Sequence, residues 1–168
     1  MQRKRQQGMV AVEFAAVGVV FFTILLGAFE AGLVMGNREY LENAAMQGAK
    51  VLASKRGYTN PWSTTRTAIQ NKLPGSLAST VITLDIVIPC VGSCSCPSGY
   101  SASNNLCVST CTSDSACATV LSAGLDTDNP VIKDGRMARV TLVYAYSRIS
   151  SYFSNLTSLN AVISEPVQ

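Results

Sequence analysis

Glu13 is an ionisable residue near the start of an apolar run that extends from Gly8 to Met35. The run contains no Lys, Arg, Asp, Pro or Asn, and its only other charged residue is Glu30. A carboxylate deep in a membrane costs about 2.5–3.5 kcal/mol on insertion scales, so Glu13 is a candidate functional residue. The cost falls if the residue lies near the membrane surface, is protonated or meets a cation.

The cysteines form the second set of residues with potential chemistry. All six lie within residues 90–117, in a stretch that is rich in Ser, Gly and Thr. An even number of cysteines in an exported domain indicates a disulfide framework, here of up to three bridges with 15 possible pairings. Each bridge would contribute about 2–4 kcal/mol by restricting the unfolded chain. The candidates are Cys90, Cys94, Cys96, Cys107, Cys111 and Cys117.

Two alternatives for the cysteines are a metal site and free or mixed thiols. The chain has no His. The spacings C-x3-C-x-C and C-x3-C-x5-C also differ from the paired C-x2-C pattern of zinc sites. An oxidising compartment would favour disulfides as well. We therefore expect disulfides, no bound metal and no cofactor.

Enzymatic chemistry has no support in the sequence. Without His, neither a Ser-His-Asp nor a Cys-His arrangement can form. A Gly-rich phosphate loop is also missing from the sequence. Asp126, Asp128 and Asn129 resemble a fragment of a calcium loop, but the closing Glu is missing, so we expect a solvated turn. We therefore expect no catalytic residues and a protein that is not an enzyme.

The apolar run predicts a membrane-spanning helix. At about 1.5 Å per residue, residues 9–35 would be roughly 40 Å long, which spans a hydrocarbon core of about 30 Å with some tilt. Arg3, Lys4 and Arg5 precede the run, so we expect the N-terminus in the cytoplasm. Removing these three from the 13 basic residues of the chain leaves 10, which equals the number of acidic residues. The basic excess is therefore a topogenic signal, and nucleic-acid binding has no support.

A plain signal anchor and a cleaved signal peptide are the alternatives for residues 1–35. The apolar run is longer than a usual signal-peptide core. It also lacks a clear small-x-small cleavage site followed by a polar start. Glu13 at the head of such a core would be unexpected.

The basic leader, Gly8, four apolar residues, Glu13 and a hydrophobic helix together resemble a type IV prepilin processing site. This resemblance implies cleavage after Gly8 by a prepilin peptidase. It implies N-methylation of the new N-terminus at Met9. It also implies that Glu13 pairs with the N-terminal amine of a neighbouring subunit, so that assembly neutralises a charge in the membrane.

The segments 11–15, 27–32, 41–45 and 48–50 are similar to the TadE-like proteins, which are minor pilins or pseudopilins of tight-adherence (Flp) pilus systems. One departure is Ala31, where the family more often has an aromatic residue. The resemblance implies a role in initiating, stabilising or capping the pilus. The implied partners are the prepilin peptidase, the major pilin, a second minor pilin, the inner-membrane assembly platform and membrane lipid.

The same resemblance implies a single-pass protein of the bacterial inner membrane, with the C-terminal domain in the periplasm or carried into an extracellular pilus. Two other functions stay open. The protein could be an adhesive module at the pilus tip that binds a surface through its disulfide-rich loop. It could instead be a membrane-anchored domain unrelated to pili, which would undergo no processing.

The chain divides into four expected parts. Residues 1–8 are the leader, 9–35 the transmembrane and assembly helix, 36–57 an amphipathic extension, and 58–168 a periplasmic domain that contains the Cys-rich loop. We expect one helix from residue 9 to about 56. Small residues would let this helix approach others closely, although membrane helices are rich in Gly and Ala anyway. The candidates for such packing are Gly27, Ala31 and Gly32.

Alternating apolar residues predict strands over 80–88, 137–147 and 158–164, and a short helix is expected over 65–73. A helix over 150–160 is the alternative for the last strand, because short apolar runs fit both periods. The expected fold is α+β, in which a long N-terminal helix packs on a small antiparallel sheet. The disulfide-rich segment would be a loop inserted between the first two strands.

Overall fold

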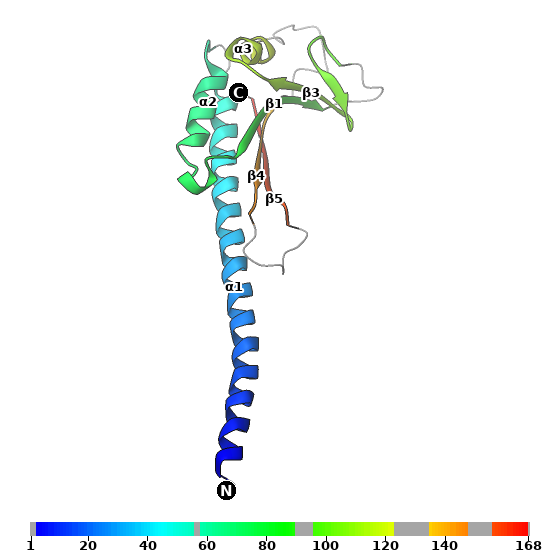
Figure 1. Ribbon diagram of the computed structural model, residues 1–168. Helices are drawn as coiled ribbons and strands as arrows, with labels where there is room; N and C mark the ends of the chain where they lie inside the picture. Colours follow the sequence, from blue (N-terminus) through cyan, green and yellow to red (C-terminus); the bar gives the residue numbers. More distant parts are fainter. Residues whose placement is uncertain (1–2, 56–57, 90–95, 123–134, 148–155, 168) are drawn as a thin grey trace.

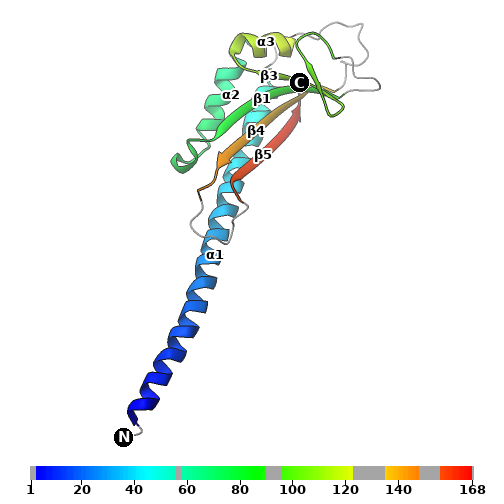
Figure 2. The ribbon, with the colours of Figure 1, turned by 45° about the vertical axis from the view of Figure 1, so that its right-hand side comes forward.

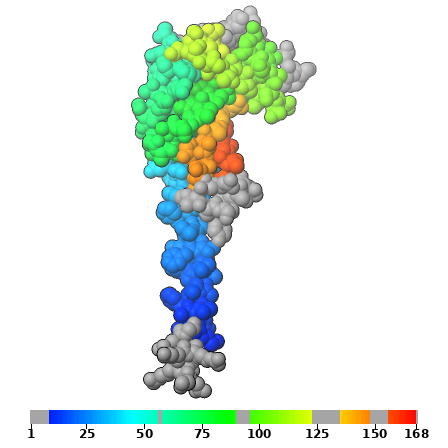
Figure 3. All heavy atoms as spheres, viewed as in Figure 1, coloured from blue at the N-terminus to red at the C-terminus, as the bar shows by residue number. Residues whose placement is uncertain are grey.

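The computed structural model shows one long helix with a small domain on its C-terminal half (Figure 1). This helix, α1, spans Arg3–Ala53, and its 51 residues give a length of about 75 Å. In the space-filling view, its N-terminal half extends away from the domain (Figure 3). The predicted α+β class is therefore confirmed. The structure describes residues 3–55, 58–89, 96–122, 135–147 and 156–167.

The prediction of one continuous helix is confirmed, although both ends differ from the prediction. α1 begins at Arg3, so the basic residues before Gly8 continue the same helix. It ends at Ala53 instead of near residue 56. The Ser54 N–H then donates to the Lys50 carbonyl at 3.1 Å, which satisfies one carbonyl of the last turn.

The C-terminal half of α1 packs on the domain through a stripe of small and apolar residues. Leu41, Ala45 and Leu52 are fully buried, with the spacing of an amphipathic helix. A Cβ at Gly48 would lie 2.5 Å from Ile69 Cγ1. The close approach of the second helix therefore requires glycine at this position.

The second helix, α2, spans Pro61–Gln70 and begins four residues before the predicted start. Its first residue is proline, whose fixed φ is already helical and whose missing N–H is not needed in the first turn. Ile69 and Thr65 are buried on the side that faces α1 and the core. A 3₁₀ turn follows at Gly75–Leu77.

The domain contains an antiparallel sheet of five strands in the order β2-β3-β1-β4-β5 (Figure 2). The central strand β1 pairs with β3 on one side and with β4 on the other. The three predicted strands correspond to β1, β4 and β5. The bounds are β1 Val81–Pro89, β2 Ser101–Ser103, β3 Leu106–Cys111, β4 Met137–Ala145 and β5 Ser158–Pro166.

The helical alternative for residues 150–160 is wrong in its described part, because residues 158–160 begin β5. Leu159 and Ala161 alternate toward the core and are buried. β5 pairs with β4 along the whole length of β4, which a helix could not do. These strand contacts decide between the two conformations. Residues 150–155 lie outside the described residues.

The prediction of a plain inserted loop at 90–117 is incomplete. This stretch contributes β2 and β3, and it runs into the helix α3 (Asp114–Ser122). On β3 the residues Cys107, Ser109 and Cys111 alternate toward the buried side. Their types suggested a loop, but a disulfide-bonded cysteine packs as a small apolar residue and can occupy core positions of a strand.

Candidate functional site

Residues 9–29 of α1 present an apolar surface, and none of them is buried. Phe14 is 80% exposed and Phe22 is 64% exposed. The most apolar 18-residue window of the helix has a mean hydropathy of 2.5, and no part of that window is buried within the structure. The helix is thus long and apolar enough to cross a membrane. An exposed apolar surface of this size marks a site of contact with a membrane or with another protein.

Gly8, Met9 and Glu13 lie at the start of this surface, in the first turns of α1. The Met9 side chain is 74% exposed, and Glu13 is exposed as well. Met9 and Glu13 are four residues apart, so they share one face of the helix. The expected roles of these three residues in processing and subunit pairing stay predictions.

The small residues proposed for helix packing, Gly27, Ala31 and Gly32, lie closer to the C-terminal half of α1. No heavy atom lies within 4 Å of the place that a Cβ would take at Gly27 or Gly32. Ala31 is half-buried. Packing within the chain therefore does not require glycine at these positions, in contrast to Gly48. Their role in close approach to another helix stays a prediction.

Glu30 is the first buried residue of α1 from Met9 onward, the part of the helix whose side chains the structure describes, and 1% of its surface is exposed. Tyr146, which follows β4, lies near it. Burial raises the pKa of the Tyr146 hydroxyl, and the negative charge of Glu30 raises it further. The sequence pattern assigned no role to Glu30. The spacing of Glu30 could have indicated its burial. Val34, Asn37 and Leu41 follow it at helical intervals of four, seven and eleven residues, and they are also buried or half-buried.

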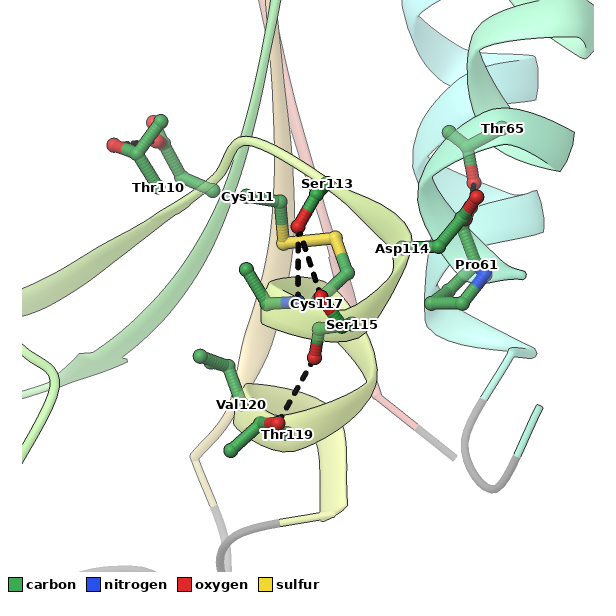
Figure 4. The surroundings of a disulfide bond; sticks show 12 residues. Pro61, Thr65, Thr110, Cys111, Ser113, Asp114, Ser115, Cys117, Thr119 and Val120 are labelled. Carbon is green, nitrogen blue, oxygen red and sulfur yellow. Dashed lines mark hydrogen bonds between the residues drawn. A yellow bond between two sulfur atoms is a disulfide. The ribbon is translucent and has the colours of Figure 1, made fainter. Parts of the chain in front are cut away.

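Two disulfides connect the cysteines that the structure describes. Cys96 bonds to Cys107 with 5.5 Å between their Cα atoms, and Cys111 bonds to Cys117 with 4.8 Å. The second bridge connects the end of β3 to the first turns of α3 (Figure 4). The disulfide prediction is therefore confirmed for these four residues. Cys90 and Cys94 lie outside the described residues.

Asp114 connects the Cys-rich segment to α2. Its carboxylate accepts a hydrogen bond from the Ser63 backbone N–H at 2.9 Å. This bond is the main reason why the pKa of Asp114 lies below its ordinary value. Figure 4 places Asp114 between the Cys111–Cys117 bridge and the first turn of α2. The first turn of α2 thus receives its cap from a residue 51 positions away in sequence.

The sheet contains a partly buried ion pair that the sequence pattern did not predict. Asp85 on β1 accepts hydrogen bonds from Arg139 Nη2 at 2.8 Å and Arg139 Nε at 3.1 Å. Its other carboxylate oxygen accepts one from the Thr110 hydroxyl at 2.7 Å. The three residues face one another across β3, β1 and β4. Because the carboxylate, guanidinium and hydroxyl groups bond to one another, these three side chains hold the register of the strands and offer no free reactive group.

Within the residues that the structure describes, no group of three or more His, Cys, Asp or Glu side chains could hold a metal ion. The expected solvated turn at 126–129 lies outside the described residues. The arrangement therefore offers two features for interaction: the exposed apolar part of α1 and the disulfide-bonded end of the domain.

A family model described as TadE-like protein matches residues 8–50, which confirms the resemblance to TadE-like proteins of tight-adherence pilus systems. The matched residues begin at Gly8 and cover the exposed part of α1 as well as most of the stripe that packs on the domain. No curated protein and no solved structure gives a significant match to the chain.

Proposed function

We propose that this chain is a minor pilin or pseudopilin that takes part in assembling a tight-adherence pilus. In this proposal, a prepilin peptidase cleaves after Gly8 and the new N-terminus at Met9 is methylated. The exposed part of α1 then packs beside the helices of the major pilin and of a second minor pilin. The protein acts by binding and positioning subunits, and it is not an enzyme.

The observation that carries the proposal is the coincidence of the TadE-like match with an uncovered apolar helix. Residues 9–29 are apolar apart from Glu13 and Thr23, and none is buried. A partner for this surface must be apolar and elongated, which lipid and other pilin helices both are. The chain can therefore be held in a membrane first and in a helical bundle later, without refolding.

The location that follows is the bacterial inner membrane, with the N-terminus in the cytoplasm and the domain in the periplasm. Three basic residues before the apolar run favour this orientation. The disulfides agree with an oxidising periplasm. The assembly platform in the membrane would then pass the subunit into the pilus.

The proposed role of Glu13 is to pair with the N-terminal amine of an adjacent subunit. A cell that lacks the native chain and produces Glu13→Ala should make few or no pili, although the variant reaches the membrane in normal amounts. The matched control is Glu39→Ala, which removes an exposed carboxylate from the same helix beyond the apolar part. Normal piliation with Glu13→Ala would show that Glu13 does not pair subunits.

An adhesive role for the disulfide-bonded end is a second candidate. Its support is position, because β2, β3 and α3 lie at the end of the molecule farthest from the N-terminus (Figure 1). The hairpin of β2 and β3 turns through Asn104 and Asn105, which both have positive φ, and all of β2 is exposed. Arginine at Ser101 and Ser103 should reduce attachment without reducing pilus number if this surface binds a target. Unchanged attachment would leave assembly as the function.

A further inference from the structure

Strand β4 runs antiparallel to α1, and its C-terminal end points toward the exposed half of the helix. Near the upper part of β4, the Val140 side chain lies 3.5 Å from the place of a Cβ at Gly48. At the lower end, Tyr146 lies near Glu30. Both ribbon views show β4 and β5 extending alongside α1 in this way (Figures 1 and 2). The sheet therefore reaches far down the helix.

The position of Glu30 fixes how much of α1 lies outside the domain. The segment from Met9 to Phe29 is 21 residues long, which corresponds to about 31 Å of helix. The hydrocarbon core of a bilayer is about 30 Å thick. Once this segment fills the hydrocarbon core, Glu30, where the domain begins to bury α1, lies directly at the edge of that core. The length of the segment leaves no free helix to hold the domain away from the membrane surface.

From these lengths we propose that the lower end of the sheet rests on the membrane and contacts the lipid headgroup layer. We call this surface the β4–β5 end, and define it by Tyr144, Ala145, Tyr146, Leu156 and Thr157. The inference rests on the proposed membrane anchoring of α1 and goes beyond it. It shortens the expected transmembrane segment from residues 9–35 to residues 9–29.

The side chains of the β4–β5 end suit a headgroup layer. Tyrosine is enriched where proteins meet the membrane surface, because its ring is apolar and its hydroxyl is polar. This argument applies to Tyr144 and not to Tyr146, whose hydroxyl is buried. Ala145 and Thr157 are exposed, and Tyr144, Tyr146 and Leu156 are partly exposed. None of these five residues is acidic, so they offer no repulsion to anionic lipid. Glu30, whose charge acts on Tyr146, is itself buried.

The single tryptophan of the chain makes this contact measurable. Trp62 lies in the first turn of α2, at the end of the domain that also carries Asp114. With Trp62→Phe as background, one variant adds Ala145→Trp at the β4–β5 end. A matched variant adds Met137→Trp at the other end of the same strand, on the same face. The two positions are eight residues apart, or about 26 Å along the strand.

Each full-length variant is placed in phosphatidylcholine–phosphatidylglycerol vesicles, and its fluorescence is quenched by lipids that carry a nitroxide in the headgroup region. We expect quenching of Ala145→Trp to exceed that of Met137→Trp by at least threefold. Quenching of Thr157→Trp, on the β5 side, should be as strong as that of Ala145→Trp. This second position excludes an effect that is specific to one substitution. Intact disulfides and an unchanged circular dichroism spectrum verify the fold of each variant.

A further variant, Phe21→Trp in the same background, reports on the anchor itself. Strong quenching of Phe21→Trp by nitroxides deep in the acyl chains, together with equal weak quenching at residues 145, 157 and 137, would overturn the membrane contact alone. Absence of quenching at Phe21→Trp would overturn both the anchoring and the contact that depends on it. Strong quenching at residues 21, 145 and 157 but not at 137 supports the proposal.

Discussion

The carboxylate of Asp114 accepts a hydrogen bond from the backbone N–H of Ser63 at 2.9 Å, across 51 residues of sequence. Because this bond favours the charged carboxylate, the pKa of Asp114 lies below its ordinary value. The Cys111–Cys117 bridge holds the start of α3, so the disulfide-bonded segment and α2 form one connected unit. This unit occupies the end of the domain opposite to the β4–β5 end.

The first prediction concerns the pH dependence of this contact. A lowered folded-state pKa means that Asp114 stabilises the fold fully above the unfolded carboxyl pKa of about 3.9 and loses this effect as the pH falls through the folded value. The thermal midpoint of the native protein should therefore exceed that of Asp114→Ala at pH 7. The difference should shrink when the pH is lowered below about 4.

Asp114→Asn is the control, because an amide oxygen can still accept the Ser63 N–H but does not titrate. Its midpoint relative to Asp114→Ala should stay constant over the same pH range. Midpoints are followed by circular dichroism in detergent. A native-to-Ala difference that is independent of pH would show that the charge of Asp114 contributes nothing.

The second prediction concerns the partly buried pair of Asp85 and Arg139. The Asp85 side chain is 6% exposed and the Arg139 side chain 26%. Arg139→Met leaves a buried carboxylate without its cation and should cost about 3 kcal/mol in the free energy of unfolding. The double variant Asp85→Val with Arg139→Met should recover most of this loss, because an apolar pair can replace an ion pair of similar volume.

Denaturant unfolding of the two single variants and the double variant gives the coupling energy directly. A coupling below about 0.5 kcal/mol would show that the two side chains act independently, in contradiction to their two hydrogen bonds.

The third prediction separates two glycines of α1. Gly48→Ala should destabilise the fold by about 1–3 kcal/mol, because the new Cβ would lie 2.5 Å from Ile69 Cγ1. Gly32→Ala should not destabilise it, since no heavy atom lies within 4 Å of that position. If Gly32 packs against another pilin helix, its substitution should instead reduce piliation. Equal losses of stability in both variants would contradict this assignment of the two faces.

Sequence reasoning recovered the parts of the structure that follow from periodic patterns. The long helix, β1, β4 and β5 all have strong apolar periods, and the cysteine count predicted the bridges. The features that the sequence did not predict depend on contacts between residues that are distant in sequence. The start of α2 is fixed partly by Asp114, and β3 was hidden because its buried residues are Cys and Ser.

Glu30 and Asp85 show why the polar contacts were harder to predict. Each is a carboxylate in an apolar segment, which signals burial with a partner but does not say which partner. Glu30 lies near Tyr146, 116 positions later, and Asp85 meets Arg139 through strand pairing. These partner residues can be identified only once the arrangement of the strands and the helix is known. Glu13 differs, because its proposed partner belongs to another chain.

The central claim is that the chain is processed as a prepilin, and its most direct test is the intact mass and N-terminal sequence of the protein from its native membrane. The account predicts a chain that starts at Met9, carries one added methyl group and lacks two hydrogen atoms for each disulfide. Gly8→Arg should remain uncleaved and keep residues 1–8. A native protein that starts at Met1, or a Gly8→Arg variant that is still cleaved at the same place, would contradict the account.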